Sequence, residues 1–162
     1  MVIIVTGTPC TGKSTLAREL ALELKYEYVD VSLLVKDICS EFDDERDCLV
    51  VDVTRLNELL IAKMSKNKKL VIDSHLSHHI DPKYIDVCIV CKCELKELKK
   101  RLKARGYSSA KVRENMDAEI FDVCLVEAQE EMKHNVIVLE TDNGYDIKEV
   151  VKRVNEAKHS RA

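Results

Sequence analysis

The feature that most constrains how this chain folds is a glycine-containing loop close to its start. The segment Gly7-Thr8-Pro9-Cys10-Thr11-Gly12-Lys13-Ser14 directly follows the apolar run Val2-Ile3-Ile4-Val5. A pattern typical of an apolar-periodic helix then runs from Lys13 to about Leu24. A buried strand, a turn with the spacing Gly-x-x-x-x-Gly-Lys-Ser and a helix are the successive parts of a phosphate-binding loop. The sequence therefore predicts a nucleotide-binding unit at the beginning of the chain.

The residue types in this loop suit a bound polyphosphate. Backbone N–H groups of such a loop converge on the phosphates, and the following helix adds the positive end of its dipole. Lys13 is expected to reach the β- and γ-phosphates, and the Ser14 hydroxyl is a candidate ligand for Mg²⁺.

Length and composition narrow the class of protein. A chain of 162 residues with 46% hydrophobic and 34% charged residues is typical of one soluble globular domain. No apolar run approaches the length of a membrane span, and no signal-peptide pattern precedes the first strand. Seven cysteines, an odd number, favour a reducing compartment over a disulfide framework. We therefore expect a cytoplasmic protein, or a nuclear one in a eukaryote, with no membrane partner.

The rest of the chain alternates between strand and helix patterns. Strands are predicted near residues 2–6, 27–30, 69–74, 85–91 and 135–139. Continuous apolar runs such as Leu70-Val71-Ile72 are typical of strands buried on both faces, which predicts a parallel sheet with helices on each side. Leu95, Leu98 and Leu102 follow helical spacing. Residues 109–133 are long enough for one six-turn helix capped by Ser108 or Ser109.

A second motif, Asp73-Ser74-His75, ends one of these apolar strands. A carboxylate at such a strand end is the usual partner of a phosphate loop, because it holds Mg²⁺ directly or through water. On extended chain, Asp73 and His75 would leave the same face of the sheet and point at one site. His75 could then orient a water molecule, position a loop or take a proton, whereas a purely structural hydrogen bond to a carbonyl is the alternative.

Two other clusters look like metal sites but have simpler explanations. His78 and His79 follow His75 closely, yet Mg²⁺ prefers oxygen ligands, and a polar loop explains them better. In a strand, Cys88 would face away from Cys91 and Cys93, so we interpret these cysteines as small buried hydrophobic residues.

Taken together, these motifs resemble the small, atypical adenylate kinase family of archaea and eukaryotic nuclei, also described as coilin-interacting nuclear ATPases. Beyond the loop, the matching segments span most of the chain: Asp47-Cys48 with Asp52 and Arg55, Asp73-Ser74-His75, Arg105-Gly106-Tyr107, Glu114-Asn115 and Ala118-Glu119-Ile120. The Asp-x-His triplet together with Arg-Gly-Tyr distinguishes this family from other proteins that share the phosphate loop.

The resemblance implies a three-layer α/β fold like that of the P-loop nucleoside monophosphate kinases, with a five-stranded parallel sheet. One domain over residues 1–162 would carry a monophosphate-binding arm at about 31–54 and a short lid at about 105–115. ATP is implied as the nucleotide, Mg²⁺ as the metal at Ser14 and Asp73, and Lys13, Asp73, His75 and Arg105 as the catalytic residues. The implied ATP contacts are Gly7, Cys10, Thr11, Gly12, Lys13, Ser14, Thr15 and Arg105.

Two departures from the family pattern bear on the site. Cys10 stands where the family usually has glycine, so a positive φ there would be strained. Lys36 stands where an arginine would clamp the AMP phosphate, and an ammonium group cannot form a bidentate fork.

The function implied is that of an adenylate kinase that converts ATP and AMP to two ADP. Because a short lid excludes water poorly, we also expect ATP hydrolysis without AMP. The resemblance links the family to maturation of the small ribosomal subunit through a ribosomal protein partner of the S11 family. The alternative is therefore an ATP-switched assembly factor whose hydrolysis releases that partner.

Charge patterning leaves two further alternatives open. Acidic residues crowd the predicted arm, where they could receive a basic segment of a partner or simply keep the surface soluble; they are Asp37, Glu41, Asp43, Asp44, Glu45 and Asp47. The helix before the lid is rich in Lys and Arg and could face RNA, although a solvated helix surface with a phosphate-binding end is the favoured interpretation. Arg101 in this helix could likewise reach the phosphates or remain a solvated charge.

Overall fold

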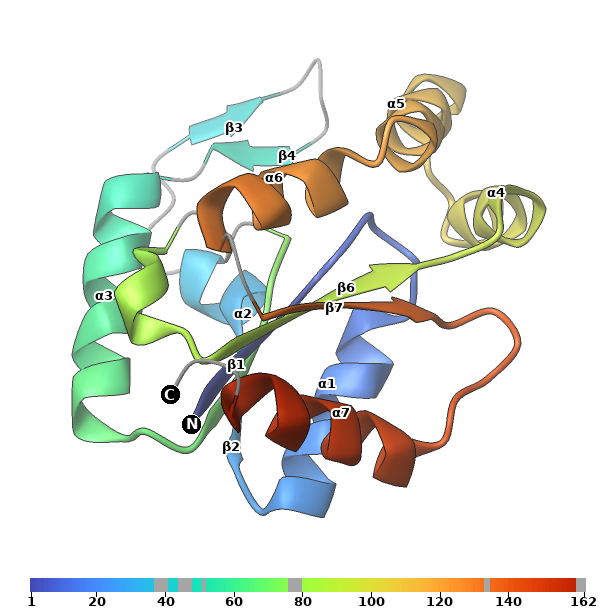
Figure 1. Cartoon of the computed structure of the whole chain (residues 1–162). Helices are drawn as coiled ribbons and strands as arrows, with labels where there is room; N and C mark the ends of the chain where they lie inside the picture. The colour runs from blue at the N-terminus through green and yellow to red at the C-terminus, as the bar shows by residue number, and fades with distance from the viewer. Residues whose placement is uncertain (37–40, 44–47, 51, 76–79, 133–134, 160–162) are drawn as a thin grey trace.

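A computed structural model of the chain describes residues 1–36, 41–43, 48–50, 52–75, 80–132 and 135–159. Within this part of the chain, five strands form a parallel sheet in the order β2-β5-β1-β6-β7 (Figure 1). They are β1 (Val2–Thr6), β2 (Glu27–Asp30), β5 (Leu70–Asp73), β6 (Val87–Lys92) and β7 (Val136–Glu140). A separate antiparallel pair, β3 (Glu41–Asp43) and β4 (Cys48–Val50), lies within the predicted arm.

The helices connect these strands as the sequence pattern predicts for a parallel sheet. They are α1 (Lys13–Leu24), α2 (Val31–Lys36), α3 (Val53–Lys66), α4 (Leu95–Ala104), α5 (Ser109–Ile120), α6 (Val123–Met132) and α7 (Ile147–His159), with a short 3-10 helix η2 (Pro82–Tyr84). No helix in the described part of the chain is long and apolar enough to cross a membrane.

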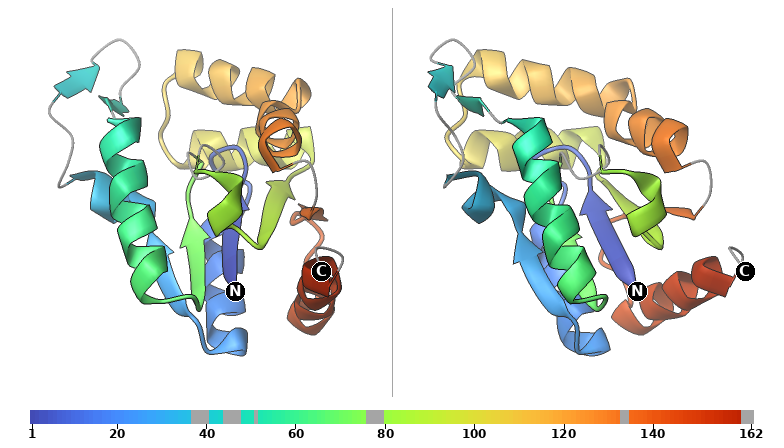
Figure 2. Two further views of the ribbon diagram at one scale, coloured as in Figure 1. Left: turned by 60° about the vertical axis from the view of Figure 1, so that its left-hand side comes forward. Right: turned by 90° about the vertical axis from the view of Figure 1, so that its left-hand side faces the viewer.

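Side chains of β1 point alternately to the two faces of the sheet, and a layer of hydrophobic core lies on each face. All five residues of β1 are buried, because helices cover both faces of a parallel sheet. Ile3 and Val5 pack against α1 and α7, whereas Val2 and Ile4 pack in the cluster that contains α3 and α6. Figure 2 shows the sheet between these helices. The predicted three-layer α/β fold is confirmed, and the predicted strands agree with the observed ones to within two residues.

A third, smaller cluster holds α4 and α5 above the carboxyl-terminal edge of the sheet. Leu98 and Leu102 of α4 are fully buried against Val112 of α5 and Cys93. Ser108 caps α5, because its side chain accepts a hydrogen bond from the Lys111 N–H at 3.2 Å. This helix pair lies beside the phosphate loop, since Cys10 joins the same cluster.

The prediction of one helix over residues 109–133 was wrong. The chain leaves the helical path after Ile120, and Asp122 takes a left-handed conformation with φ 53°. The Asp122 carboxylate accepts a hydrogen bond from Lys92 at the end of β6, so a contact from another element holds the break. The second helix, α6, therefore turns away from α5 and covers the sheet.

Candidate nucleotide site

The loop between β1 and α1 has a backbone that only glycine adopts without strain at several positions. Gly7, Cys10 and Gly12 have φ values of 139°, 70° and 90°. A Cβ atom at Gly7 would lie 2.5 Å from the Cys91 carbonyl oxygen of the neighbouring strand. Cys10 therefore does adopt a positive φ, in a conformation that residues with a side chain rarely adopt.

This loop leaves the start of α1 open to an anion. Gly12 is the N-cap of α1 and offers no side chain to accept from the first helical N–H groups. Those groups, at the residues from Lys13 onward, have no acceptor within the helix either. They and the helix dipole favour a negatively charged group at this end. Lys13 and Ser14 are half-buried here, and Thr15 is exposed.

Contacts within the loop and from β7 fix its shape. The Thr8 carbonyl oxygen accepts hydrogen bonds from the Thr11 N–H at 3.2 Å and from the Thr11 hydroxyl at 2.8 Å. Thr141, just after β7, donates its hydroxyl to the Thr11 carbonyl, and its side chain would contact any Cβ added at Gly12. The turn at residues 141–144 thus begins beside the loop.

Asp73 ends β5, the strand next to β1, as the sequence predicted for the partner of the loop. Its carboxylate is buried and accepts a hydrogen bond from the Tyr28 hydroxyl at 3.0 Å. Burial, together with the negative charge of Asp73, raises the pKa of Tyr28 well above its ordinary value. Tyr28 therefore stays a hydrogen-bond donor at neutral pH.

Sequence reasoning missed the residues that surround Asp73. Asp30 pairs with Asp73 across β2 and β5, and its Oδ2 lies 3.5 Å from the same Tyr28 hydroxyl. The Arg18 guanidinium lies over the Tyr28 ring at 5.3 Å and 3.9 Å from Asp30. β2 and β5 are neighbours only in the folded sheet, so nothing local in the sequence links Tyr28 and Asp30 to Asp73. A polar residue at the carboxyl end of each predicted strand was the available signal.

The prediction that His75 shares a face of the sheet with Asp73 required both residues to lie in a strand, and His75 does not. β5 ends at Asp73, and His75 lies in a bend two residues later, where it is exposed. Alternate residues share a face only in extended chain. Strand geometry therefore gives no reason for the His75 side chain to point at the same site as Asp73.

Arg105 reaches back to the phosphate loop from the end of α4. Its Nη1 lies 3.9 Å from the Cys10 sulfur, to which it donates a hydrogen bond, and its guanidinium lies 5.5 Å from the Tyr107 ring centre. Arg105 is thus at the loop, as predicted for a residue over the triphosphate. Arg101, one turn earlier, instead donates to Glu97 of its own helix at 3.0 Å.

The predicted lid is a turn followed by the start of a helix. Gly106, with φ 80°, turns the chain between α4 and α5, and residues 109–115 belong to α5. Several predictions fall outside the described residues: for the arm, those on Asp37, Asp44, Glu45, Asp47 and the side chains of Lys36, Glu41 and Asp43, and after β5, those on His78 and His79. Asp52 is the N-cap of α3 and accepts from the Arg55 N–H at 3.0 Å.

The strand cysteines are buried thiols. Cys88 packs in the cluster with α3 and α6, whereas Cys91 packs in the cluster with α1 and α7, so the two face opposite ways as predicted. Burial raises the pKa of both thiols to about 12. Both therefore stay protonated at neutral pH.

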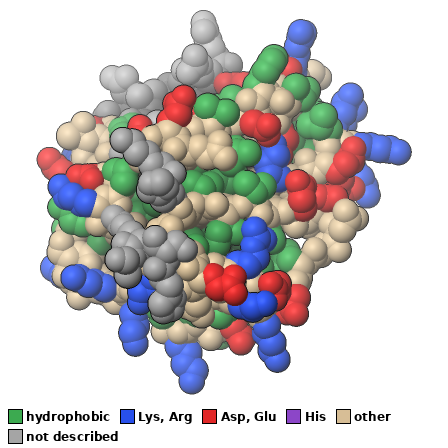
Figure 3. All heavy atoms as spheres, viewed as in Figure 1, with side chains coloured by type: hydrophobic (Ala, Val, Ile, Leu, Met, Phe, Trp, Pro, Cys, Tyr) green, Lys and Arg blue, Asp and Glu red, His purple; other side chains and the backbone are tan. Residues whose placement is uncertain are grey.

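The surface visible in Figure 3 mixes charges of both signs. Lys and Arg side chains protrude along its lower edge, and Asp and Glu side chains lie beside them at the right. In α4, Lys100 and Arg101 both pair with Glu97. Both pairs share the one carboxylate of Glu97, so the helix stays rich in positive charge, and the two alternatives for its surface stay open.

Comparisons with known proteins agree with this geometry. A family model described as an AAA domain matches residues 3–122. The chain is 37% identical to a protein named "Putative adenylate kinase" from Methanocaldococcus jannaschii, over 99% of this chain and 88% of the relative. It is 32% identical to the adenylate kinase isoenzyme 6 homolog of Caenorhabditis elegans, over 95% and 87% of the two chains. Shikimate kinase from Acinetobacter baumannii, 14% identical, has the same fold with a TM-score of 0.63 over 99% of this chain and 93% of the shikimate kinase chain.

Proposed function

This chain belongs to the atypical adenylate kinase family, and from that membership we propose that it transfers the γ-phosphoryl group of ATP to AMP. Membership of the family makes the chain a nucleotide kinase with a phosphate loop. The transfer to AMP and the roles of individual residues are the proposal. The observation that carries it is the open start of α1 beside the carboxylate of Asp73, because the two flank one edge of the sheet.

Charge neutralisation is the main task of such a site, since phosphoryl transfer needs positioning more than covalent help. Lys13 would contact the β- and γ-phosphates, and the backbone N–H groups of the loop would hold their oxygens. Arg105 would add a second positive charge, and its contact with Cys10 places it at the loop already. As ADP leaves, these cations would stabilise the charge that develops on the β-phosphate.

The residues at this edge also suit Mg²⁺. The Ser14 hydroxyl and the Asp73 carboxylate are oxygen donors, which Mg²⁺ prefers. The bound ion would neutralise charge on the phosphates. Tyr28 would keep the Asp73 carboxylate oriented through its hydrogen bond.

The acceptor would approach from the side of β2 and the arm. The carboxyl ends of parallel strands form the binding crevice in sheets of this kind. Asp30 and Asp73 end the adjacent strands β2 and β5 there, and Tyr28 lies two residues before the end of β2. His75, exposed just beyond β5, would face solvent or the acceptor rather than the core.

A coupled assay of ADP formation tests the proposal. With Mg-ATP and AMP, the wild-type chain should form two ADP for each ATP consumed. Lys13→Met should lower the rate by about a hundredfold or more, the scale of losing one electrostatic contact to the transition state. Lys66→Met, at the exposed far end of α3, removes the same charge and should change nothing. A chain that consumes ATP at the same rate with and without AMP, and forms one ADP each time, would not be an AMP kinase.

ATP hydrolysis without AMP is the second activity we propose. The lid consists of one turn at Gly106 and the start of α5, and such a short lid leaves room for water. The same assay without AMP should release phosphate above the Lys13→Met background. If addition of a small-subunit ribosomal protein raised this rate and AMP did not, the assembly-factor function would be favoured instead.

A further inference from the structure

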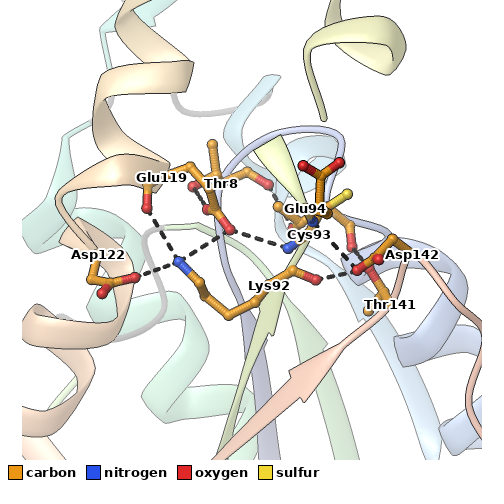
Figure 4. Close-up of polar contacts among 9 residues, drawn as sticks. Thr8, Lys92, Cys93, Glu94, Glu119, Asp122, Thr141 and Asp142 are labelled. Carbon is orange, nitrogen blue, oxygen red and sulfur yellow. Dashed lines mark hydrogen bonds and ion pairs between the residues drawn. The ribbon is translucent and has the colours of Figure 1, made fainter. Parts of the chain in front are cut away.

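A buried polar cluster lies behind the phosphate loop, and the proposed function does not use it. Glu119, near the end of α5, is only 5% exposed. Its two carboxylate oxygens accept hydrogen bonds from the Thr8 hydroxyl at 2.6 Å and from the Cys93 N–H at 3.1 Å. Figure 4 shows this carboxylate between the loop and the end of β6. Glu119 therefore contacts a loop residue that lies 111 positions earlier in the chain.

Lys92 compensates the buried charge of Glu119. Its ammonium group lies 3.1 Å from a carboxylate oxygen of Glu119, donates to the Glu119 backbone carbonyl at 3.2 Å and pairs with Asp122. Burial alone would lower the pKa of Lys92, but the hydrogen bond to Asp122 and the charge of Glu119 outweigh it and raise that pKa. The ammonium form is therefore held firmly, and the carboxylate stays paired.

The partner of Glu119 in the loop is the residue that sets the turn. Thr8 is 1% exposed, and its carbonyl oxygen accepts both hydrogen bonds from Thr11. Fixing the Thr8 side chain therefore also fixes the carbonyl around which the loop turns. This turn sets the direction of the N–H groups after Thr11, which would bind phosphate.

We propose that Glu119 is a positioning residue for ATP. Its carboxylate holds Thr8 and so keeps the phosphate loop in the shape that receives the triphosphate. Because Glu119 belongs to α5, the helix that follows the lid turn, it also ties the position of the lid to the loop. This inference rests on the proposed function only in requiring that the loop binds ATP; it does not require AMP as the acceptor.

Binding of Mg-ATP, measured by calorimetry below the unfolding temperature of every variant, tests the inference. Thr8→Val removes the hydroxyl and keeps the shape, whereas Glu119→Met removes the acceptor. Each should weaken ATP binding about tenfold, the scale of a hydrogen bond to a charged group. The double variant should bind no more weakly than the weaker single variant, because both changes remove the same contact.

A conservative variant separates positioning from folding. The amide of Glu119→Gln can still accept from the Cys93 N–H and donate to the Thr8 hydroxyl oxygen, so its ATP affinity should stay within about threefold of wild type. Glu130→Gln, an exposed change on α6, is the matched control and should not alter binding. In the kinase assay, the KM for ATP should rise in Thr8→Val while the KM for AMP does not.

The possible results are distinct. Wild-type ATP affinity in Thr8→Val, or losses in the two single variants that multiply in the double variant, would overturn the inference. If Glu119→Met does not fold, Thr8→Val and Glu119→Gln still decide it. Undiminished ATP binding in Lys13→Met would instead count against the loop as the ATP site, and so against the proposed function itself.

Discussion

The proposed ATP side and the proposed acceptor side of the site are held in different ways. On the ATP side, Thr8, Thr11 and Glu119 are all at most 5% exposed and bond to one another or to Thr141. On the acceptor side, Asp30 pairs at 3.9 Å with Arg18, whose side chain is 62% exposed. The first set is packed inside the protein, whereas the second depends on an arginine that is mostly exposed to solvent.

This difference teaches where a substitution should have its effect. Buried groups lose both packing and hydrogen bonds when they change, so changes on the ATP side should affect stability and binding together. Exposed pairs contribute little to stability. Changes on the acceptor side should therefore leave the fold intact and affect only the reaction.

The largest expected effect on stability is that of Gly7→Ala. The new Cβ would meet the Cys91 carbonyl oxygen at 2.5 Å, and φ 139° is unfavourable for alanine. We expect a loss of about 4 kcal/mol, because the strain of the conformation adds to the displacement of a neighbouring strand. Urea unfolding gives the measurement. Gly106→Ala, with φ 80° and nothing within 4 Å of its Cβ, should cost only about 1 kcal/mol. Equal losses in the two variants would show that the strand contact does not matter.

Lys92→Met should follow, with a loss of about 3 kcal/mol, since it leaves the buried Glu119 carboxylate without its cation. Lys152→Met, which breaks an exposed pair with Glu149 at 3.7 Å, should change stability by no more than about 0.5 kcal/mol. The pKa of Lys92 is raised in the folded chain, so its contribution is fully present below its ordinary value of 10.5 and is lost as the pH rises through the folded-state value. A difference between wild type and Lys92→Met that stayed constant into that alkaline range would contradict this assignment.

On the acceptor side, Tyr28→Phe should lower kcat about tenfold and change stability by less than about 1 kcal/mol. The variant removes the donor to Asp73 and keeps the ring. Steady-state kinetics and thermal unfolding, measured on the same samples, check both parts. The control is Tyr145→Phe, which removes an exposed hydroxyl bonded to Glu19 at 2.7 Å and should leave kcat unchanged. A large drop in stability with normal kcat would reverse the comparison between the two sides.

The smallest effect is expected for Cys10→Gly. Glycine relieves the positive φ of 70° but adds freedom to the unfolded chain, so the variant should be more stable by only about 0.5 kcal/mol. The hydrogen bond from Arg105 to the sulfur is lost as well. Thermal unfolding measures the balance. A loss above about 1 kcal/mol would mean that the sulfur contact, rather than the backbone, decides the conformation of the loop.

The sequence was sufficient wherever a pattern is local. The bounds of β1, β2 and α1 agree with prediction, because a continuous apolar run or a helical period defines each of them. The loop and Asp73 were found for the same reason. The helix break at Asp122 was missed because Lys92, 30 residues away in the chain, holds its left-handed backbone.

Contacts across the sheet account for the rest of what could not be predicted. Tyr28 reads as an ordinary strand residue until β2 lies next to β5 and brings its hydroxyl to Asp73. Glu119 matched the family pattern, but its role depends on Thr8, which lies in another element. His75 shows the opposite error, because a rule for strands was extended past the point where β5 ends.

The hydrogen bond from Thr141 to Thr11 joins positions 130 residues apart, and it has a consequence for the newly made protein. Because translation runs from the amino terminus, the nucleotide motif is synthesised before Glu119 and Thr141, the residues that brace it. A nascent chain that stops before Glu119 would carry the motif without either brace. We therefore expect tight retention of ATP to begin only after Thr141 has been synthesised, so that nucleotide capture reports that both braces have formed.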